Sequence, residues 1–248
     1  TCGNATRCIA SILFAETGKE TLNIETPNGI IECHKKKNEL ISVNIGKPKI
    51  AWNEIPLDKD VSTLKLPLKG EPTATNFGNP HCTFFVDDLN KVDVKTQGSI
   101  IENDVLLLQK TNVQFVKILD RTHIEMRVWE RGSGITLASG SSSCAAVDAG
   151  IRRDLLDNRV EVELDGGTVE VEKKVTGVWW GGRASYFCVR FAVNSLLSSW
   201  SLLWQNNSYA TPPVIVNELH AFCPFFFNDH MKKHRRGLMH TSFSISSH

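Results

Sequence analysis

The chain has 248 residues, of which 41% are hydrophobic and 22% charged, a balance typical of a globular protein with one large or two ordinary domains. A net charge of +1 gives no electrostatic reason to expect a nucleic-acid partner, and no apolar run reaches the ~18 residues of a membrane span. The seven cysteines are odd in number and form no CxxC pair, which predicts reduced thiols in a cytoplasmic protein rather than a disulfide framework.

The first predicted element is a helix over residues 5–15, with apolar side chains at Ile9, Ile12 and Leu13 and a glycine, Gly18, beyond its end. This helix begins almost at the first residue of the sequence, whereas a helix start of this kind normally follows a strand and a loop. We therefore expect the sequence to lack an N-terminal segment.

A hairpin of alternating apolar residues is predicted next, over residues 22–33, with an Asn28-Gly29 pair that suits a type I′ turn. Residues 34–37 are basic and predict a surface turn. A strand over residues 40–45 follows, and Gly46-Lys47-Pro48 ends it, so we expect the boundary between two halves of the chain here.

The second half contains a Gly78-Asn79-Pro80-His81 segment, followed by residues 82–86 (Cys-Thr-Phe-Phe-Val), which predict a buried strand with Asn79 and His81 at its start. The remaining predicted elements, in chain order, are a helix over 94–101, paired strands over 113–119 and 123–130, a helix over 145–153, and a hairpin over 160–171 that turns at Gly166-Gly167.

The two halves repeat one pattern, since Cys2-Gly3 and Ser139-Gly140 each precede a helix and a hairpin at a spacing of about 137 residues, which indicates an internal duplication. A helix start presents free backbone N–H groups and the positive end of a dipole to an anion. We therefore expect the two helix starts to face each other across one pocket and to bind one carboxylate together.

These patterns predict three segments: the remainder of a first half over residues 1–46, a second half over 47–176, and an atypical tail over 177–248. The tail is rich in tryptophan and serine without a clear period, which predicts a poorly ordered extension or a translation from another reading frame. The irregular spacing of its histidines and cysteine does not match a metal site, so no metal ligand is expected among His220, Cys223, His230 and His234.

Three motifs occur in a specific order: Cys2-Gly3-Asn4, the Gly78–His81 segment, and residues 130–140, which read Glu-Arg-Gly-Ser-Gly-Ile-Thr-Leu-Ala-Ser-Gly. Together they resemble the diaminopimelate epimerase family, within the wider group that includes proline racemase. The resemblance covers roughly residues 1–175 on the order and spacing of these motifs.

The resemblance implies a reaction without cofactor, in which one cysteine thiolate removes the α-proton of an amino acid and a second cysteine delivers a proton to the opposite face. Cys2 takes the place of one catalytic cysteine, and a helix N-terminus lowers the pKa of a thiol so that the thiolate is accessible near neutral pH. The second catalytic cysteine is expected at position 139, where this chain has Ser139.

An alcohol is a far weaker acid than a thiol, so Ser139 is expected to slow two-base epimerisation by about 10²–10⁴. Three explanations stay open: an inactivating change, a natural serine that supports one-sided proton exchange or a dehydratase, and replacement by Cys144. Cys144 lies more than a helical turn beyond the loop and is expected to face the core, as is Cys8 at the parallel place in the first copy.

The resemblance further implies a set of substrate-binding residues. Backbone and hydroxyl donors around the reacting carboxylate come from both helix starts, and the distal end of the substrate is held by amides and a guanidinium. These residues are Gly3, Asn4, Gly140 and Ser141 for the carboxylate, Asn79, Asn112 and Arg131 for the distal end, Glu130 for an ammonium group or the second proton transfer, and His81 near the thiols. Simpler interpretations remain, with Asn112 capping a turn and Glu130-Arg131 forming a surface ion pair.

The expected fold is α+β, with two pseudo-symmetric halves, each a curled antiparallel sheet around a central helix, and the active site between them. The expected function is interconversion of LL- and meso-diaminopimelate, weak or absent because of Ser139. The alternatives are a lyase-like relative with a single thiolate base and a non-catalytic substrate-binding remnant. The expected partner is a small amino-acid substrate, with no cofactor, nucleic acid or membrane; a homodimer is left open.

Overall fold

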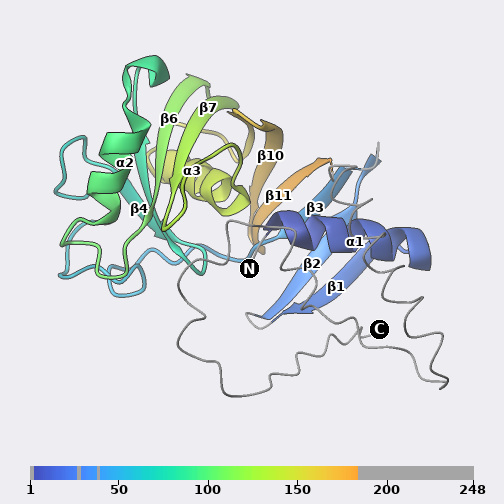
Figure 1. Ribbon diagram of the computed structural model, residues 1–248. Coiled ribbons are helices and arrows are strands. Elements are labelled where there is room, and N and C mark those ends of the chain that lie inside the picture. The colour runs from blue at the N-terminus through green and yellow to red at the C-terminus, as the bar shows by residue number, and fades with distance from the viewer. Residues whose placement is uncertain (1–2, 27–28, 38–39, 184–248) are drawn as a thin grey trace, which may run out of the picture. The chain divides into compact units, whose positions relative to one another are not determined.

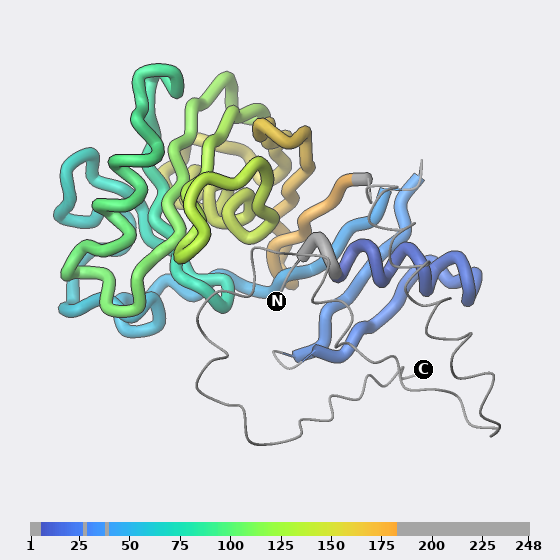
Figure 2. Tube along the Cα trace, viewed as in Figure 1, coloured from blue at the N-terminus to red at the C-terminus, as the bar shows by residue number. Residues whose placement is uncertain are grey.

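The computed structural model describes residues 3–26, 29–37 and 40–183, which are coloured in Figure 1. Figure 2 traces the same chain as a tube in the same view. The chain divides into two compact units, of which the first comprises the described residues up to Ile41 together with Arg183, and the second comprises Ser42–Gly182. Helices and strands of mixed direction occur together, so the predicted α+β class is confirmed. No helix within the described ranges is long and apolar enough to cross a membrane.

The first unit contains helix α1 (Gly3–Thr17), strands β1 (Thr21–Thr26) and β2 (Gly29–Lys35), and the start of β3 (Leu40–Asn44). The predicted helix, hairpin and strand are therefore confirmed. The helix buries Ala10 and Phe14, which are one turn apart, while the predicted apolar residues Ile9, Ile12 and Leu13 flank this face and are only half-buried.

Two details of the first hairpin differ from the sequence prediction. The register pairs Thr26 with Gly29, so Gly29 is the first residue of β2, with a φ of +113° that favours glycine, and the two residues between them lie outside the described residues. The predicted basic turn is also shorter, because His34 and Lys35 continue the ladder of β2.

The second unit begins after the boundary within β3 and holds most of the described elements. They are β4 (Thr73–Asn76), β5 (Pro80–Phe85), the 3₁₀ helix η2 (Leu89–Lys91), α2 (Val94–Glu102), β6 (Asn112–Asp120), β7 (His123–Glu130), β8 (Gly134–Thr136), α3 (Gly140–Arg152), β9 (Arg159–Leu164), β10 (Gly167–Lys174) and β11 (Gly177–Arg183). Within this unit the strands follow the order β11-β10-β9-β7-β6-β5-β4, and β8 pairs with β7.

The sheet of the second unit is largely antiparallel, but β5 pairs with β6 and β7 pairs with β9 in parallel. A parallel pair needs a crossover connection, and here α2 lies in the connection from β5 to β6 and α3 in the connection from β7 to β9. Helix α3 buries every residue from Ser142 to Gly150 and contacts β4, β5, β6 and β10. In Figure 1 this helix lies among the strands of the second unit. It is the central helix that the sequence predicts for this half.

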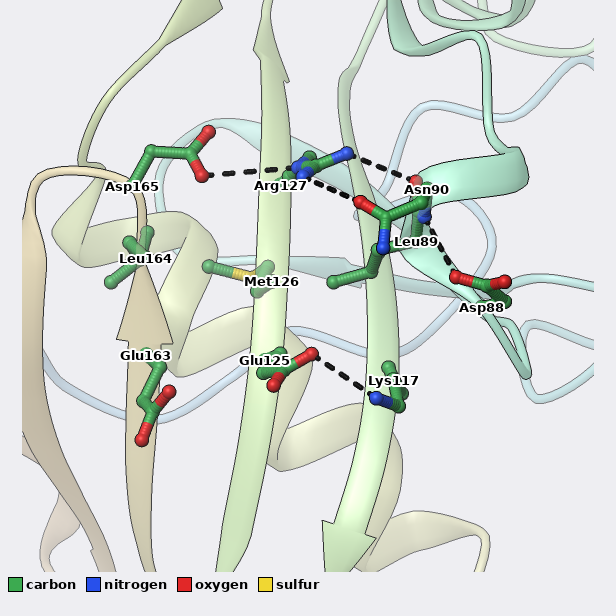
Figure 3. Close-up of a pocket in the computed structure, with 10 residues that line it drawn as sticks. All are labelled: Asp88, Leu89, Asn90, Lys117, Glu125, Met126, Arg127, Glu163, Leu164 and Asp165. Carbon is green, nitrogen blue, oxygen red and sulfur yellow. Dashed lines mark hydrogen bonds and ion pairs between the residues drawn. The ribbon is translucent and has the colours of Figure 1, made fainter.

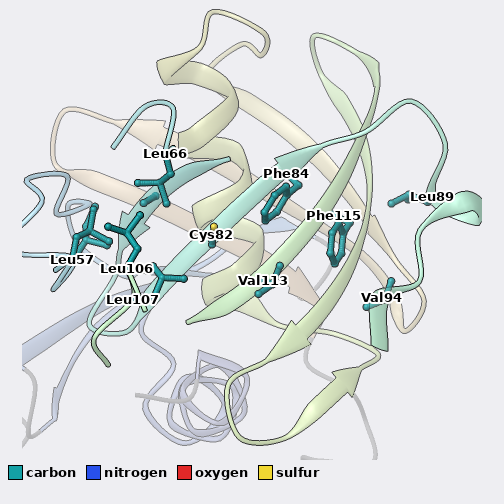
Figure 4. Packing of buried hydrophobic residues seen from close by; sticks show 12 residues of the cluster. Leu57, Leu66, Cys82, Phe84, Leu89, Val94, Leu106, Leu107, Val113 and Phe115 are labelled. Atoms are coloured by element: carbon teal, nitrogen blue, oxygen red, sulfur yellow. The ribbon is translucent and has the colours of Figure 1, made fainter. Parts of the chain in front are cut away.

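Along the first five residues of β5 and of β6, both faces of the strand pair are buried, and the two faces differ in chemistry. Alternate residues of these strands, including Cys82, Phe84 and Phe115, join an apolar cluster with residues of α2 and the loops, and the rings of Phe84 and Phe115 stack at 5.5 Å (Figure 4). The intervening residues His81, Thr83 and Gln114 are fully buried and polar. The polar side of this strand pair therefore lies away from the apolar cluster.

A helix followed by a hairpin occurs twice along the chain, as the spacing of the motifs predicts: α1 with β1 and β2, and α3 with β9 and β10. A third strand, which the motifs did not predict for the second copy, follows each hairpin as β3 and β11. Strands β1 and β9 have the same alternation of exposed and buried residues. Leu22 pairs with Cys33 in the first hairpin, and Val160 pairs with Val171 in the second. The same buried positions therefore recur in both copies.

Three predicted boundaries in the second unit shift. Helix α3 begins at Gly140, five residues before the predicted start, and the second hairpin turns at residues 165–166, since Leu164 pairs with Gly167. Residues 177–183, at the start of the predicted tail, form β11, in which Trp179 and Trp180 are buried. The rest of that segment lies outside the described residues.

Candidate active site

The first turn of α3 is the best-defined part of the predicted site. Ser139 is the N-cap residue, with an extended backbone at φ −149° and ψ 117°, but its hydroxyl does not cap the helix. Instead, the Ser139 carbonyl accepts hydrogen bonds from the backbone N–H of Ser143 at 3.0 Å and from the Ser143 hydroxyl at 2.8 Å. Among the described residues, the half-buried Ser139 side chain and the first N–H groups of the helix therefore remain available to a ligand.

Gly140 is required at the second position of this motif by packing. A Cβ atom on Gly140 would lie 2.8 Å from Cζ2 of Trp180, a residue that is 3% exposed. The ring of Trp180 thus lies against the backbone at the helix start. Any larger residue at position 140 would have to displace a buried indole.

The Gly78–His81 segment is connected to this helix start by buried hydrogen bonds. His81 Nε2 lies 3.0 Å from Oδ1 of Asn79, and His81 Nδ1 lies 2.9 Å from Nε2 of Gln114. The same Gln114 nitrogen donates to the hydroxyl of Ser142 in the first turn of α3 at 3.1 Å. Asn79 and α3 are therefore joined through two intermediate side chains.

Burial determines the charge state of His81. The side chain is fully buried, and loss of hydration, with a smaller contribution from the charge of Arg131, lowers the pKa of His81 to about 3. The imidazole is therefore neutral near pH 7, with both nitrogens engaged. This arrangement suits a residue that positions Asn79 rather than one that contacts a substrate directly.

Asn112, Glu130 and Arg131 lie close together at the end of β7. The Asn112 side chain donates to the carbonyl of Pro80 at 2.9 Å and accepts the backbone N–H of Arg131 at 3.0 Å. The guanidinium of Arg131 is exposed and donates to the carbonyl of Gln109 at 2.9 Å, which leaves further donors for a carboxylate. Glu130 is half-buried at the last position of the strand.

Glu102, which the sequence did not single out, supports the turn after β7 that contains Arg131. Its carboxylate is 5% exposed and accepts from the indole N–H of Trp129 at 2.7 Å and from the backbone N–H of Gly132 at 3.0 Å. Lys110 Nζ lies 3.9 Å from the same carboxylate. The turn that presents Arg131 is thus held by Asn112 on one side and Glu102 on the other.

The remaining site predictions are only partly covered by the described residues. Cys2 lies outside them, and only the backbone of Gly3 and Asn4, at the start of α1, is described. Ser141 is half-buried in the first turn of α3. The relation between positions 2 and 139 therefore stays a prediction.

Cys144 does not offer a thiol to the site. It is fully buried in α3, and burial raises the pKa of the Cys144 thiol well above its usual range, with a further contribution from Asp148. Cys8 is also buried. The core position predicted for both residues is confirmed, and replacement of the second catalytic cysteine by Cys144 is not supported.

The middle of α3 is anchored by a buried carboxylate, which the sequence analysis also missed. Asp148 is fully buried, and its Oδ1 lies 2.7 Å from Nζ of Lys173 on β10. At the end of the helix, Arg152 donates to the carbonyl of Ala74 and the hydroxyl of Thr75 on β4 at 2.7 and 3.2 Å. Two charged side chains therefore fix the helix that begins at Ser139.

A polar recess lies elsewhere on the second unit and shares no residue with the predicted site (Figure 3). Its charged side chains are largely paired, with Lys117 3.4 Å from Glu125 and Arg127 3.8 Å from Asp165. The residues that line it are Asp88, Leu89, Asn90, Lys117, Glu125, Met126, Arg127, Glu163, Leu164 and Asp165. We assign no activity to it.

One group within the described ranges brings metal-ligand atoms together: His123, Glu161 and Glu163, whose atoms lie within 4.8 Å of one another. These side chains are partly or fully exposed, and His123 Nε2 lies 3.1 Å from the Glu161 carboxylate, an ordinary ion pair. The tail residues His220, Cys223, His230 and His234 lie outside the described residues.

Comparison with known proteins identifies the family that this arrangement belongs to. The sequence matches the family model described as diaminopimelate epimerase over residues 73–185. A diaminopimelate epimerase of Acidiphilium cryptum (strain JF-5) is 44% identical over 172 residues, covering 68% of this chain and 62% of the relative. That of Rhodospirillum centenum (strain ATCC 51521 / SW) is 40% identical over 175 residues, covering 69% and 60%.

A diaminopimelate epimerase of Wolbachia sp. subsp. Drosophila simulans (strain wRi) is 42% identical over 177 residues, covering 69% of this chain and 68% of the relative. The chain thus spans 62% and 60% of the length of the Acidiphilium and Rhodospirillum relatives. Among solved structures, a hydroxyproline epimerase from Agrobacterium vitis aligns at 9% identity with a TM-score of 0.49, covering 72% of this chain and 63% of that one.

Proposed function

Because the chain belongs to the diaminopimelate epimerase family, we propose that it acts on diaminopimelate as an amino-acid epimerase, interconverting the LL and meso forms by proton transfer at the α-carbon. The chemistry needs a base on one face of the carbon and an acid on the other. Cys2 supplies the thiolate in this proposal, and residue 139 stands on the opposite face. No cofactor is required, since the carbanion charge spreads into the substrate carboxylate.

The observation that carries the proposal is the geometry at the start of α3. Ser139 stands at the N-cap without capping the helix, so backbone N–H groups of the first turn can receive the carboxylate as its negative charge grows. Gly140 has no side chain, so the buried Trp180 ring can lie against this helix start and support it. The motif therefore combines a proton-transfer position with an anion site.

The distal end of the substrate is assigned to a second group of residues. The exposed guanidinium of Arg131 can bind a carboxylate through two parallel hydrogen bonds, and Glu130 can pair with an ammonium group. Asn112 accepts the backbone N–H of Arg131 and donates to the carbonyl of Pro80, the residue after Asn79, so we assign both asparagines to this end of the substrate. Substrates that carry a second amino-acid end would be favoured over simple amino acids.

We propose that the chain as written is weakly active or inactive. The Ser139 hydroxyl has no histidine or carboxylate hydrogen-bonded to it among the described residues, so nothing there activates it as an acid or base. Loss of one proton-transfer group typically reduces a rate by about 10²–10⁴. Binding without turnover is therefore the second candidate function, and Ser139 is the observation that favours it.

The test is incorporation of deuterium at Cα of LL-diaminopimelate in deuterated water, compared between the chain as written and the Ser139→Cys variant. We expect slow exchange or none in the former and an increase of at least about a hundredfold in the variant. Equal rates in both proteins would contradict the assignment of position 139. Exchange without inversion in the chain as written would instead favour the lyase-like, one-base alternative.

A further inference from the structure

Gln114 lies at the centre of the buried polar layer between β5, β6 and α3. It is fully buried, and its amide contacts three side chains. Its Oε1 accepts from the hydroxyl of Thr83 at 3.2 Å, and its Nε2 lies 2.9 Å from His81 Nδ1 and 3.1 Å from the hydroxyl oxygen of Ser142. Both hydrogens of the amide and its oxygen are thus used.

The direction of these hydrogen bonds fixes the proton on His81. An amide nitrogen only donates, so His81 Nδ1 must be the acceptor and the single proton of the neutral ring must lie on Nε2. His81 Nε2–H then donates to Oδ1 of Asn79 at 3.0 Å. The oxygen end of the Asn79 amide is therefore turned inward.

This series of hydrogen bonds determines which end of the Asn79 amide points away from His81. With Oδ1 held by His81, the NH₂ group is the end of the amide that remains, and no acceptor for it is recorded within the described part of the chain. Asn79 is half-buried, so this group can meet a ligand. A donor pair at this position selects a ligand atom that accepts, such as a carboxylate oxygen, over an ammonium group.

We propose that Gln114 is a positioning residue that determines the polarity of the binding site, by fixing the tautomer of His81 and thereby the end of the Asn79 amide that faces the ligand. The same NH₂ group of Gln114 holds Ser142, so the orientation of Asn79 and the first turn of α3 are set together. The ligand part of this inference rests on the proposed function, while the tautomer part does not.

The opposite arrangement makes a different and measurable prediction. If Oε1 of Gln114 faced His81, the ring would carry its proton on Nδ1, and Asn79 would turn its oxygen outward. A network with a purely structural role would tolerate either tautomer or a mixture. The location of one proton therefore separates the proposal from both alternatives.

The experiment is two-bond ¹H–¹⁵N NMR of the full chain labelled with ¹⁵N-histidine. His81 is recognised as the ring whose signals do not move between pH 8 and pH 5, since its pKa lies far below this range. We expect Nδ1 of His81 to carry no proton and Nε2 to be protonated. A protonated Nδ1, or signals averaged between tautomers, would overturn the proposal without any variant.

The decisive variant is Gln114→Glu, which keeps the shape of the side chain but replaces the NH₂ donor with a carboxylate acceptor. We expect His81 Nδ1 to gain a proton in this variant, and an unchanged tautomer would overturn the proposal. Gln97→Glu is the matched control, because Gln97 is exposed on α2 and carries the same change of charge. If Gln114→Glu does not fold, Gln114→Met is measured, and a tautomer that stays fixed there would also overturn the proposal.

The consequence for binding is measured by titration calorimetry with meso-diaminopimelate. We expect the Gln114→Glu variant to bind at least about tenfold more weakly than the original chain, since a donor facing the carboxylate becomes an acceptor, and Gln97→Glu to bind as the original chain does. Equal affinity in Gln114→Glu would overturn the link to the ligand. Absence of binding by the original chain would count against the proposed function, while the NMR result would still decide the role of Gln114.

Discussion

Nε2 of Gln114 on β6 lies 3.1 Å from the hydroxyl oxygen of Ser142 on α3, although the two residues are 28 positions apart. This contact joins the strand pair that carries Asn79 and His81 to the helix start at Ser139. Because both side chains are fully buried, the hydrogen bond cannot be exchanged for one with water. The Gly78–His81 segment and the helix start at Ser139 are thus both held by Gln114.

Gly140→Ala should destabilise the protein, although alanine normally stabilises a helix relative to glycine. The new Cβ would lie 2.8 Å from the ring of Trp180, and overpacking of this kind costs about 1–3 kcal/mol. The free energy of unfolding by urea measures the effect. Adding Trp180→Phe should recover part of the loss, whereas a stable single variant would show that the indole moves freely.

His81 should make stability depend on pH. Because its pKa is lowered from 6.5 to about 3 in the folded protein, the unfolded chain binds more protons between these values, and stability falls as the pH falls through this window. The slope from this one group approaches about 1.4 kcal/mol per pH unit. Urea unfolding from pH 7 to pH 4 checks it, with His81→Asn expected to flatten the profile; parallel profiles would contradict a neutral, buried His81.

Glu102→Gln should loosen the turn that presents Arg131. The carboxylate accepts from both Trp129 and Gly132, and an amide offers only one acceptor oxygen, so one partly buried donor loses its partner at a cost of about 1 kcal/mol. Thermal unfolding measures the loss. Glu54→Gln is the control, because Glu54 is exposed, and an equal effect of both changes would exclude this explanation.

Lys173→Met should be more damaging than a typical substitution of a partly exposed lysine. It leaves Asp148 as a fully buried carboxylate without its cation, which costs about 3 kcal/mol or more. The double variant Asp148→Ala with Lys173→Met should recover part of this loss, since it removes the buried charge without adding volume at a fully buried position. A double-mutant cycle with chemical denaturation gives the coupling, and additive losses would contradict a direct pair.

Local patterns in the sequence were sufficient for most of the secondary structure. The alternation in residues 160–171 and the apolar periodicity of residues 94–101 predict a hairpin and a helix because side-chain direction repeats every two or every 3.6 residues. The start of α3 was predicted five residues too late, since Gly140 and the three serines after it have weak helix propensity and are held by tertiary packing instead.

The supporting residues of the site were not predictable in the same way. A glutamine within the apolar run Val113–Val116 is a recognisable signal, because a polar residue in a buried strand needs a partner, but its partners lie 28 to 33 positions away. Glu102 and Asp148 look like ordinary helical surface residues in the sequence, and only their burial reveals their roles.

By itself, then, the amino-acid sequence determined the periodic elements, the duplicated helix-and-hairpin pattern and the motifs at Asn79, Arg131 and Ser139, because these depend on neighbouring residues and on residue type. The tertiary structure alone decided which buried polar atoms meet, and thus the charge state and proton of His81. The reason is physical: hydrogen-bond direction and dehydration depend on atoms brought together from distant strands, and no local pattern encodes their arrangement.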